Sequence, residues 1–237
     1  MKTTLHKADT RGHANHGWLN SYHTFSFANY YDPERQNFGV LRVLNDDEVS
    51  AGMGFGKHGH SNMEIISIPL EGDLEHEDSM GNKTVIRSGD IQVISAGTGV
   101  QHSEKNKNSD SKVKFLQIWV IPNKANVEPR YDQITLQASN LLNRFHQVLS
   151  PDKEDDGVWA HQNTWFHMGN FDTEITTRYQ LKDSSNGLYV FVLEGECKIG
   201  DIELTRRDGL GIEEAEHFNF NIEPRTKLLL MEVPMAH

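Results

Sequence analysis

Four residues in the first half of the chain have the types and spacing of metal ligands. His58 and His60 form one pair, and His102 and Glu104 form a second, each with one residue between the partners. Residues two apart on a β-strand point to the same face, so each pair can aim two side chains at one point. Imidazole and carboxylate ligands together suit a first-row divalent metal. Because a carboxylate can also take a proton, the set predicts either a reaction centre or a structural metal site.

The composition argues against several classes of protein. The 237 residues include 23 Lys and Arg against 34 Asp and Glu, a formal net charge of −11, so direct nucleic-acid binding is not expected. Cys197 is the single cysteine, which excludes a disulfide framework and fits a reducing, cytoplasmic location. The first residues lack a signal-peptide pattern, and no apolar run reaches the roughly 20 residues of a membrane span, so we expect no membrane partner.

The elements that position these residues are predicted to be strands. Short runs rich in Val, Ile, Phe and Tyr recur along the chain, with turn signals such as DSMGN and SSNG between them. This pattern predicts an all-β sandwich or barrel. Residues 136–149 are an exception, because their apolar side chains fall at helical spacing, and we expect a short helix or an irregular connector there. The expected strands include residues 38–44, 64–70, 90–94, 113–121, 187–193 and 227–233.

The chain divides into two halves around a polar segment. Residues 122–157 contain three prolines and an acidic run, which is typical of a linker. The tripeptide LEG occurs at 70–72 and again at 193–195, and a Gly-Asp or Asp-Gly turn follows each copy. The repeat favours two related β domains.

Four stretches of the sequence carry a resemblance to a known family. They are HGWLNSYHTFSFANYYDP (16–33), GFGKHGHSNMEI (54–65), LEGDLEHEDSMGN (70–82) and SAGTGVQHSE (95–104). Together they resemble the pirin family of the cupin superfamily, closely over residues 8–122 and more weakly beyond. The resemblance implies a bicupin, that is, two tandem jelly-roll β-barrels. Residues 1–135 would form a metal-binding N-terminal barrel, and residues 136–237 a degenerate C-terminal barrel without metal.

The resemblance also implies a site and an activity. The family's three His and one Glu ligands fall on His58, His60, His102 and Glu104, which would hold one divalent transition metal. We expect Fe(II), with Ni, Mn, Co, Cu and Zn as alternatives. Family members resemble quercetin 2,3-dioxygenases, so a small aromatic flavonol and O₂ are the implied substrates. Glu104 would be the catalytic residue that accepts the flavonol's hydroxyl proton, and Glu64 would make a structural hydrogen bond.

Other functions remain open at this point. Some family members act as regulatory proteins, so a non-catalytic, metal-bound protein that binds a protein partner is one alternative. A cupin isomerase acting on a sugar would need Lys, Arg and Tyr around a polar pocket, whereas Met53, Phe55 and Met63 near the ligands favour a flat aromatic molecule. A purely structural metal is a third alternative. We expect a monomer, because two fused barrels can bury their own interface.

The remaining histidines are predicted to have other roles. His13, His16 and His23 lie among aromatic residues and are expected in a loop that wraps the barrel rather than in a second metal site. His76 could face the pocket or belong to an ordinary hairpin.

Overall fold

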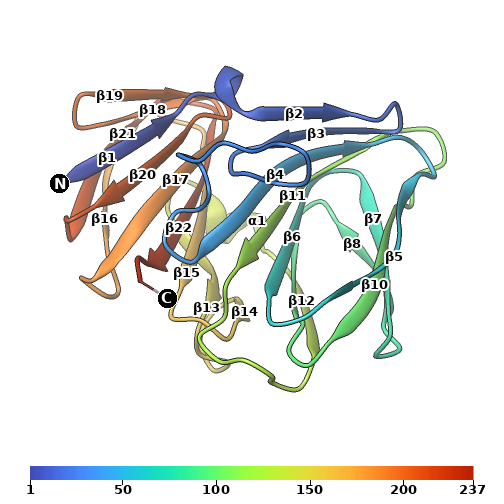
Figure 1. Cartoon of the computed structure of the whole chain (residues 1–237). Helices are drawn as coiled ribbons and strands as arrows, with labels where there is room; N and C mark the ends of the chain where they lie inside the picture. Colours follow the sequence, from blue (N-terminus) through green and yellow to red (C-terminus); the bar gives the residue numbers. More distant parts are fainter. Residues whose placement is uncertain (237) are drawn as a thin grey trace.

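The computed structural model describes residues 1–236, and these residues form strands almost throughout (Figure 1). Four sheets are arranged as two tandem β-barrels, each made of one seven-stranded and one four-stranded sheet. The predicted all-β architecture of two barrels is confirmed. Within residues 1–236, no helix has the length and apolar character that a membrane crossing requires.

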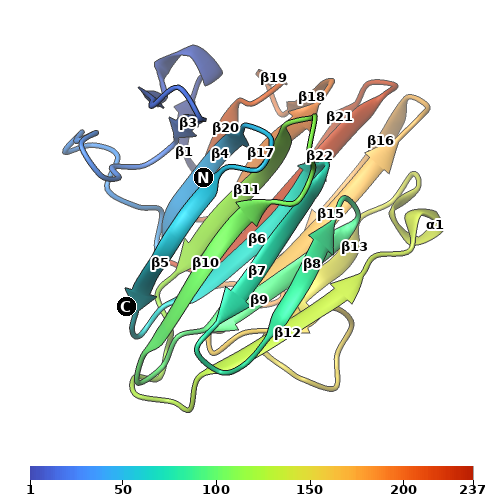
Figure 2. The ribbon, with the colours of Figure 1, turned by 90° about the vertical axis from the view of Figure 1, so that its right-hand side faces the viewer.

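The N-terminal barrel contains the candidate metal ligands. Figure 2 shows its smaller sheet in front, in the order β5-β10-β7-β8, and the larger sheet has the order β12-β9-β6-β11-β4-β3-β2. The small sheet consists of β5 (Gly54–His60), β7 (Asp73–Asp78), β8 (Lys83–Arg87) and β10 (Val100–Asn106). The large sheet consists of β2 (Gly12–Asn15), β3 (Leu19–His23), β4 (Leu41–Val49), β6 (Glu64–Glu71), β9 (Asp90–Ser95), β11 (Val113–Val120) and β12 (Arg130–Thr135).

The C-terminal barrel repeats this arrangement, with sheet orders β1-β20-β17-β22-β15-β13-β14 and β16-β21-β18-β19. Its large sheet consists of β1 (Lys2–His6), β13 (His146–Ser150), β14 (Val158–Trp159), β15 (Trp165–Phe171), β17 (Asn186–Glu194), β20 (Gly209–Glu213) and β22 (Thr226–Pro234). Its small sheet consists of β16 (Ile175–Gln180), β18 (Glu196–Ile199), β19 (Ile202–Thr205) and β21 (His217–Ile222).

A period of two along β11 divides its side chains between two environments. Leu116 and Ile118 lie in a hydrophobic core that also contains Tyr189 and Met231 of the second barrel. Phe115 packs inside the N-terminal barrel, and Gln117 lines a pocket there. Successive strand residues face opposite sides of a sheet, so one side of the large sheet is fixed against the other barrel. The opposite side is free to form a site.

The chain's first strand belongs to the sheet of the second barrel. β1 pairs antiparallel with β20 over five residue pairs, from Lys2 opposite Glu213 to His6 opposite Gly209, and it lies beside the C-terminal strands in Figure 1. The His6 Nδ1 atom lies 2.8 Å from the Tyr189 hydroxyl, which fixes the end of this strand. The division of the chain at residues 135 and 136 stays a prediction, but its first residues contribute to the second sheet.

The segment predicted as a linker is more structured than expected. β12 pairs with β9 in the first barrel, and β13 pairs with β15 in the second. The helical spacing is realised only in α1 (Ala138–Leu141), and Val148 lies in β13 within the shared core. Asn143 has a φ of 55°, a left-handed conformation that ends the helix. The expected short helix is therefore present, and sheet pairing overrides the helical spacing from His146 on.

Two glycines with positive φ provide a test of the contact between the barrels. At Gly39 (φ +52°) an added Cβ would lie 2.1 Å from the Pro234 carbonyl oxygen, whereas at Gly52 (φ +66°) it would meet nothing within 4 Å. We expect Gly52→Ala to cost about 1–2 kcal/mol from the backbone alone. Gly39→Ala should cost more than about 3 kcal/mol, because a backbone clash adds to the same strain. Urea denaturation of both variants measures the difference, and equal losses would contradict the account.

Candidate metal centre and its pocket

Three of the four predicted ligands converge inside the N-terminal barrel. β5 and β10 are antiparallel neighbours, and their register places His102 directly opposite His58. His60 lies on the same face of β5 as His58, two residues along. One ring nitrogen from each of the three histidines lies within 4.8 Å of the others, a separation suited to one shared ion. The ring centroids are 4.4–4.9 Å apart.

Three ring nitrogens of this cluster lack protein partners. His60 Nε2 and both ring nitrogens of His102 are buried without a hydrogen bond. The Nδ1 atom of His58 lies 2.8 Å from the Gly56 carbonyl oxygen and donates to it, which leaves the Nε2 lone pair available. Buried polar atoms nearly always find a partner. The three histidines therefore fit a divalent metal by their chemistry as well as by their placement.

The electrostatics of the cluster favour the form that binds a metal. Burial, together with the neighbouring His102 and His58, lowers the pKa of His60 to about 4. Burial lowers the pKa of His102 to about 3, with His58 and His76 as additional causes. Both rings are neutral at pH 7, and neutral imidazole is the ligand form.

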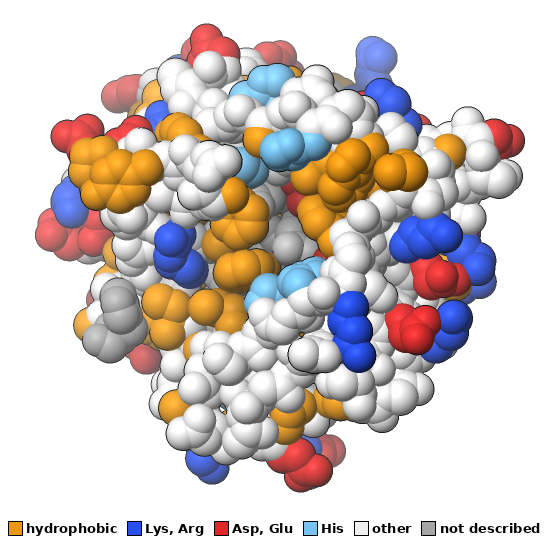
Figure 3. Space-filling view, turned by 45° about the vertical axis from the view of Figure 1, so that its right-hand side comes forward, with side chains coloured by type: hydrophobic (Ala, Val, Ile, Leu, Met, Phe, Trp, Pro, Cys, Tyr) orange, Lys and Arg blue, Asp and Glu red, His pale blue; other side chains and the backbone are white. Residues whose placement is uncertain are grey.

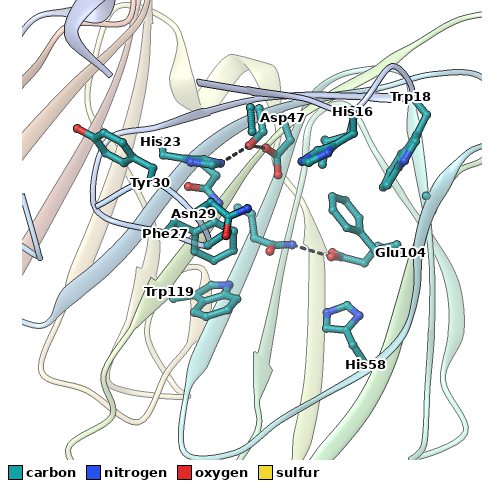
Figure 4. A pocket seen from close by; sticks show the side chains of 18 of the residues that line it. His16, Trp18, His23, Phe27, Asn29, Tyr30, Asp47, His58, Glu104 and Trp119 are labelled. Carbon is teal, nitrogen blue, oxygen red and sulfur yellow. Dashed lines mark hydrogen bonds between the residues drawn. The ribbon is translucent and has the colours of Figure 1, made fainter. Parts of the chain in front are cut away.

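Glu104 lies in the same pocket but outside the three-histidine group. It is 1% exposed, and both carboxylate oxygens accept hydrogen bonds. The Gln117 Nε2 group donates to Oε2 at 2.6 Å, and the Ser67 hydroxyl donates to Oε1 at 3.1 Å. Figure 4 shows Glu104 and His58 on the same side of the pocket. The predicted role of Glu104 as a fourth ligand thus stays a prediction.

Glu64 and His76, which the sequence also singled out, are both buried and hydrogen-bonded. Glu64 is buried in β6, where its Oε2 atom accepts hydrogen bonds from the Ser95 hydroxyl at 2.7 Å and the His161 backbone amide at 3.2 Å. His76 is buried in β7, pairs with Asp78 at 2.9 Å, and lies 5.6 Å from the His102 ring. His76 therefore packs behind the cluster.

The cluster opens into a pocket of about 660 Å³. Figure 3 shows a hollow on this face, with hydrophobic and histidine side chains gathered around it. The volume is in the range of small-molecule sites. Five aromatic side chains line the pocket, namely Trp18, Phe27, Tyr30, Phe55 and Trp119. The histidine cluster is thus reached through an aromatic cavity.

One wall of this pocket was missed by sequence reasoning. Residues 13–31 were expected to wrap the barrel and pack, yet His13, His16, His23 and several of their aromatic neighbours line the cavity. Asn45 and Asp47 also line it from the middle of β4. Polar residues at alternate positions inside an otherwise buried strand were the available signal.

Three side chains of this wall form a hydrogen-bonded group. The Ser21 hydroxyl lies 2.8 Å from His23 Nε2 and donates to Asp47 Oδ1. Burial raises the pKa of Asp47 from its ordinary value near 3.8 to about 7, although the Ser21 hydrogen bond acts in the opposite direction. Burial lowers the pKa of His23 to about 4. This wall is therefore polar but weakly charged near pH 7.

Two tandem β-barrels with a histidine cluster inside the first define a metal-binding bicupin. A family model described as Pirin matches residues 4–120, and one described as Quercetinase C-terminal cupin domain matches residues 147–233. The chain belongs to the pirin family, which confirms the resemblance seen in its motifs.

Individual relatives agree with this assignment over nearly their full length. The chain is 40% identical to quercetin 2,3-dioxygenase of Escherichia coli K12, over 97% of this chain and 98% of the relative. It is 33% identical to a pirin-like protein of Caulobacter vibrioides, over 94% and 96% of the two chains. The solved structure of the bacterial pirin YhhW of Escherichia coli in complex with nickel(II) superposes with a TM-score of 0.93 at 39% identity. That match covers 98% of this chain and 99% of the other.

The assignment of the metal ligands predicts a sharp difference between two buried histidines. His102→Ala removes a ring from the cluster, whereas His167→Ala removes a buried histidine from the second barrel. We expect His102→Ala to lose at least about 100-fold in metal affinity, above the roughly 10–100-fold typical of groups that only orient a ligand. His167→Ala should keep about one metal per chain. Elemental analysis after loading with Ni(II) or Fe(II) and desalting measures both, and full retention in His102→Ala would contradict the assignment.

The raised pKa of Asp47 predicts how stability depends on pH. The folded protein holds this proton more tightly than the unfolded chain, so wild-type stability falls as pH rises from about 4 to about 7 and stays lowered above that. Asp47→Asn lacks this loss. Its stability relative to wild type should therefore rise by up to about 4 kcal/mol between pH 4 and pH 8. Denaturation of metal-stripped protein across this range checks the sign, with the exposed Asp201→Asn as a control that should show no trend.

Proposed function

We propose that this protein is a metal-dependent dioxygenase that cleaves a flavonol such as quercetin with O₂. The observation that carries the proposal is the convergence of three histidines, two of them with unpartnered ring nitrogens, beside an aromatic pocket. The names of its full-length relatives support the same activity. The histidine cluster would hold a metal at the pocket, and the aromatic side chains of the pocket can stack on a flat aromatic molecule.

The residues present suit several divalent metals. His58, His60 and His102 would hold the ion, with Glu104 as the nearest carboxylate in the pocket. Imidazole ligands accept Fe, Ni, Cu and Zn, so availability in the cell decides among them, and we propose Fe(II). When bound, the metal supplies a Lewis acid with open positions, at which a hydroxyl becomes more acidic and an electron-rich substrate meets O₂.

Glu104 is proposed to move the proton in this reaction. Gln117 and Ser67 hold its two oxygens in fixed positions at the edge of the pocket. A flavonol that approaches the cluster with its hydroxyl and carbonyl oxygens would place the hydroxyl beside this carboxylate. Glu104 then accepts the hydroxyl proton, and the resulting anion is the form that O₂ attacks. In the overall reaction, one flavonol and one O₂ give a ring-opened ester and one CO.

The pocket lining separates this proposal from sugar chemistry. Among the described residues that line the cavity, none is Lys or Arg, whereas five are aromatic. The Trp119 ring lies 4.9 Å from the His60 ring and 5.4 Å from Phe27, so the aromatic surface reaches the cluster itself. Such a lining excludes water from the reacting anion and orients a planar ring.

Glu104→Gln tests the proposed role of the carboxylate. The substitution preserves the shape of the side chain and one acceptor oxygen but removes its basicity, so quercetin-dependent O₂ uptake by Fe(II)-loaded protein should fall at least about 100-fold. Metal content should stay near one ion per chain. Metal-stripped wild type supplies the blank, and His102→Ala supplies the variant without the metal.

Undiminished turnover in Glu104→Gln would reject the carboxylate as base. Absence of uptake in the fully loaded wild type would reject the dioxygenase and leave the regulatory, partner-binding role as the function to test. A monomeric, cytoplasmic protein remains our expectation for either role.

A further inference from the structure

A row of polar side chains crosses the large sheet on the side that faces the pocket. His23 of β3 lies opposite Asn45 of β4, and Asn45 lies opposite Gln117 of β11. Gln117 is bound to Glu104, so this end of the row belongs to the site already described. The other end, with Asn45, His23 and the neighbouring Asp47, is not used by the proposed reaction.

This second polar end has hydrogen-bonding capacity that the protein does not satisfy. The Asn45 Oδ1 and His23 Nδ1 atoms are buried without partners, and the two side chains are only 2% and 3% exposed. Leaving a buried polar group unsatisfied costs about 1–3 kcal/mol. Such groups are retained where water or a ligand completes them. Both side chains line the pocket, so a ligand in the pocket can reach this wall.

The polar end with Asn45, His23 and Asp47 lies across the pocket from His58. Figure 4 shows His23 and Asp47 at one end of the pocket and His58 at the other, with Phe27 and Trp119 along the side wall that runs down from His23. A planar molecule held at the cluster would lie along the aromatic surface and present its outer edge to the polar wall. The complementary ligand therefore has an apolar, flat middle and a polar group at the far edge.

We propose that Asn45, His23 and Asp47 form a recognition subsite for hydroxyl groups on the outer rings of an aromatic substrate. Ser21 is a positioning residue, because its hydroxyl joins His23 to Asp47 and fixes both. An amide, an imidazole nitrogen and a carboxyl group can each bond a phenolic hydroxyl. The orientation of the ligand rests on the proposed function. The subsite itself is tested by ligand binding and does not require turnover.

The subsite predicts a preference between two ligands that bind the metal alike. Quercetin and the parent flavonol share the adjacent hydroxyl and carbonyl, but only quercetin carries hydroxyls on its outer rings. We expect Ni(II)-loaded protein, kept free of O₂, to bind quercetin at least about tenfold more tightly than flavonol, as one or two hydrogen bonds require. Quenching of tryptophan fluorescence measures both dissociation constants.

Matched variants assign the preference to this wall. Asn45→Leu should reduce the ratio of quercetin affinity to flavonol affinity to between about 1 and about 3. The reason is that an apolar isostere leaves a quercetin hydroxyl unpaired. Asn29→Leu makes the same change at an exposed asparagine of the pocket mouth and should keep the wild-type ratio. Ser21→Ala leaves Asn45 in place and should lower the ratio at least about threefold, which provides a second test if Asn45→Leu does not fold.

The outcomes separate this inference from the proposed function. Equal affinity of wild type for the two ligands, or an unchanged ratio in both Asn45→Leu and Ser21→Ala, would overturn the subsite even if quercetin is turned over. A ratio that depends on these residues would support the subsite even if Fe(II)-loaded protein consumes no O₂ with either ligand, in which case the dioxygenase alone is rejected.

Discussion

The antiparallel pairing of β5 with β10 is the constraint on which the site depends. It places His102 opposite His58 and leaves His60 two residues along the same face. A slip of one residue in either strand would turn its ligands to the other side of the sheet. Because His102 is buried and ring nitrogens of His60 and His102 have no partner, the fold carries a cost at this point that a bound ion would offset. The site and the local stability of the small sheet are therefore linked.

The second barrel has a structural part in this arrangement. β4 directs Asn45 and Asp47 toward the pocket, and Asp46 between them faces the other barrel. The Asp46 carboxylate accepts hydrogen bonds from Arg207 Nε at 2.8 Å and from the guanidinium group of Arg11 at 3.3 Å. A core shared by both large sheets lies behind the same wall. The second barrel can thus hold the pocket wall of its neighbour rigid.

Sequence reasoning found the parts of the molecule that depend on local periodicity. Short apolar runs between turn signals predicted the strands around residues 64–70 and 113–121, and the i, i+2 spacing drew attention to His58, His60 and His102. The LEG repeat suggested a second β domain, and the family resemblance then implied that it is a second cupin barrel. The short helix expected in residues 136–149 is present at Ala138–Leu141, but pairing of β13 with β15 decides the structure from His146 on.

The polar wall of the pocket was not predictable in the same way. His23, Asn45 and Gln117 are far apart in the chain and become neighbours only through the order of β3, β4 and β11. Each residue alone suggests an ordinary strand position. Gln117 within the apolar run VKFLQIWV was a local sign of an inward polar contact, but its partner Glu104 could be assigned only from the packing of the two sheets.

The central claim is that His58, His60 and His102 hold one metal that an aromatic substrate can reach. X-ray absorption at the metal edge of Fe(II)-loaded protein, recorded without O₂ before and after addition of quercetin, tests it most directly. The account predicts the scattering of three imidazoles in both spectra, with a change in the oxygen ligands when quercetin is added. A metal surrounded by oxygen alone, or a spectrum that quercetin leaves unchanged, would contradict it.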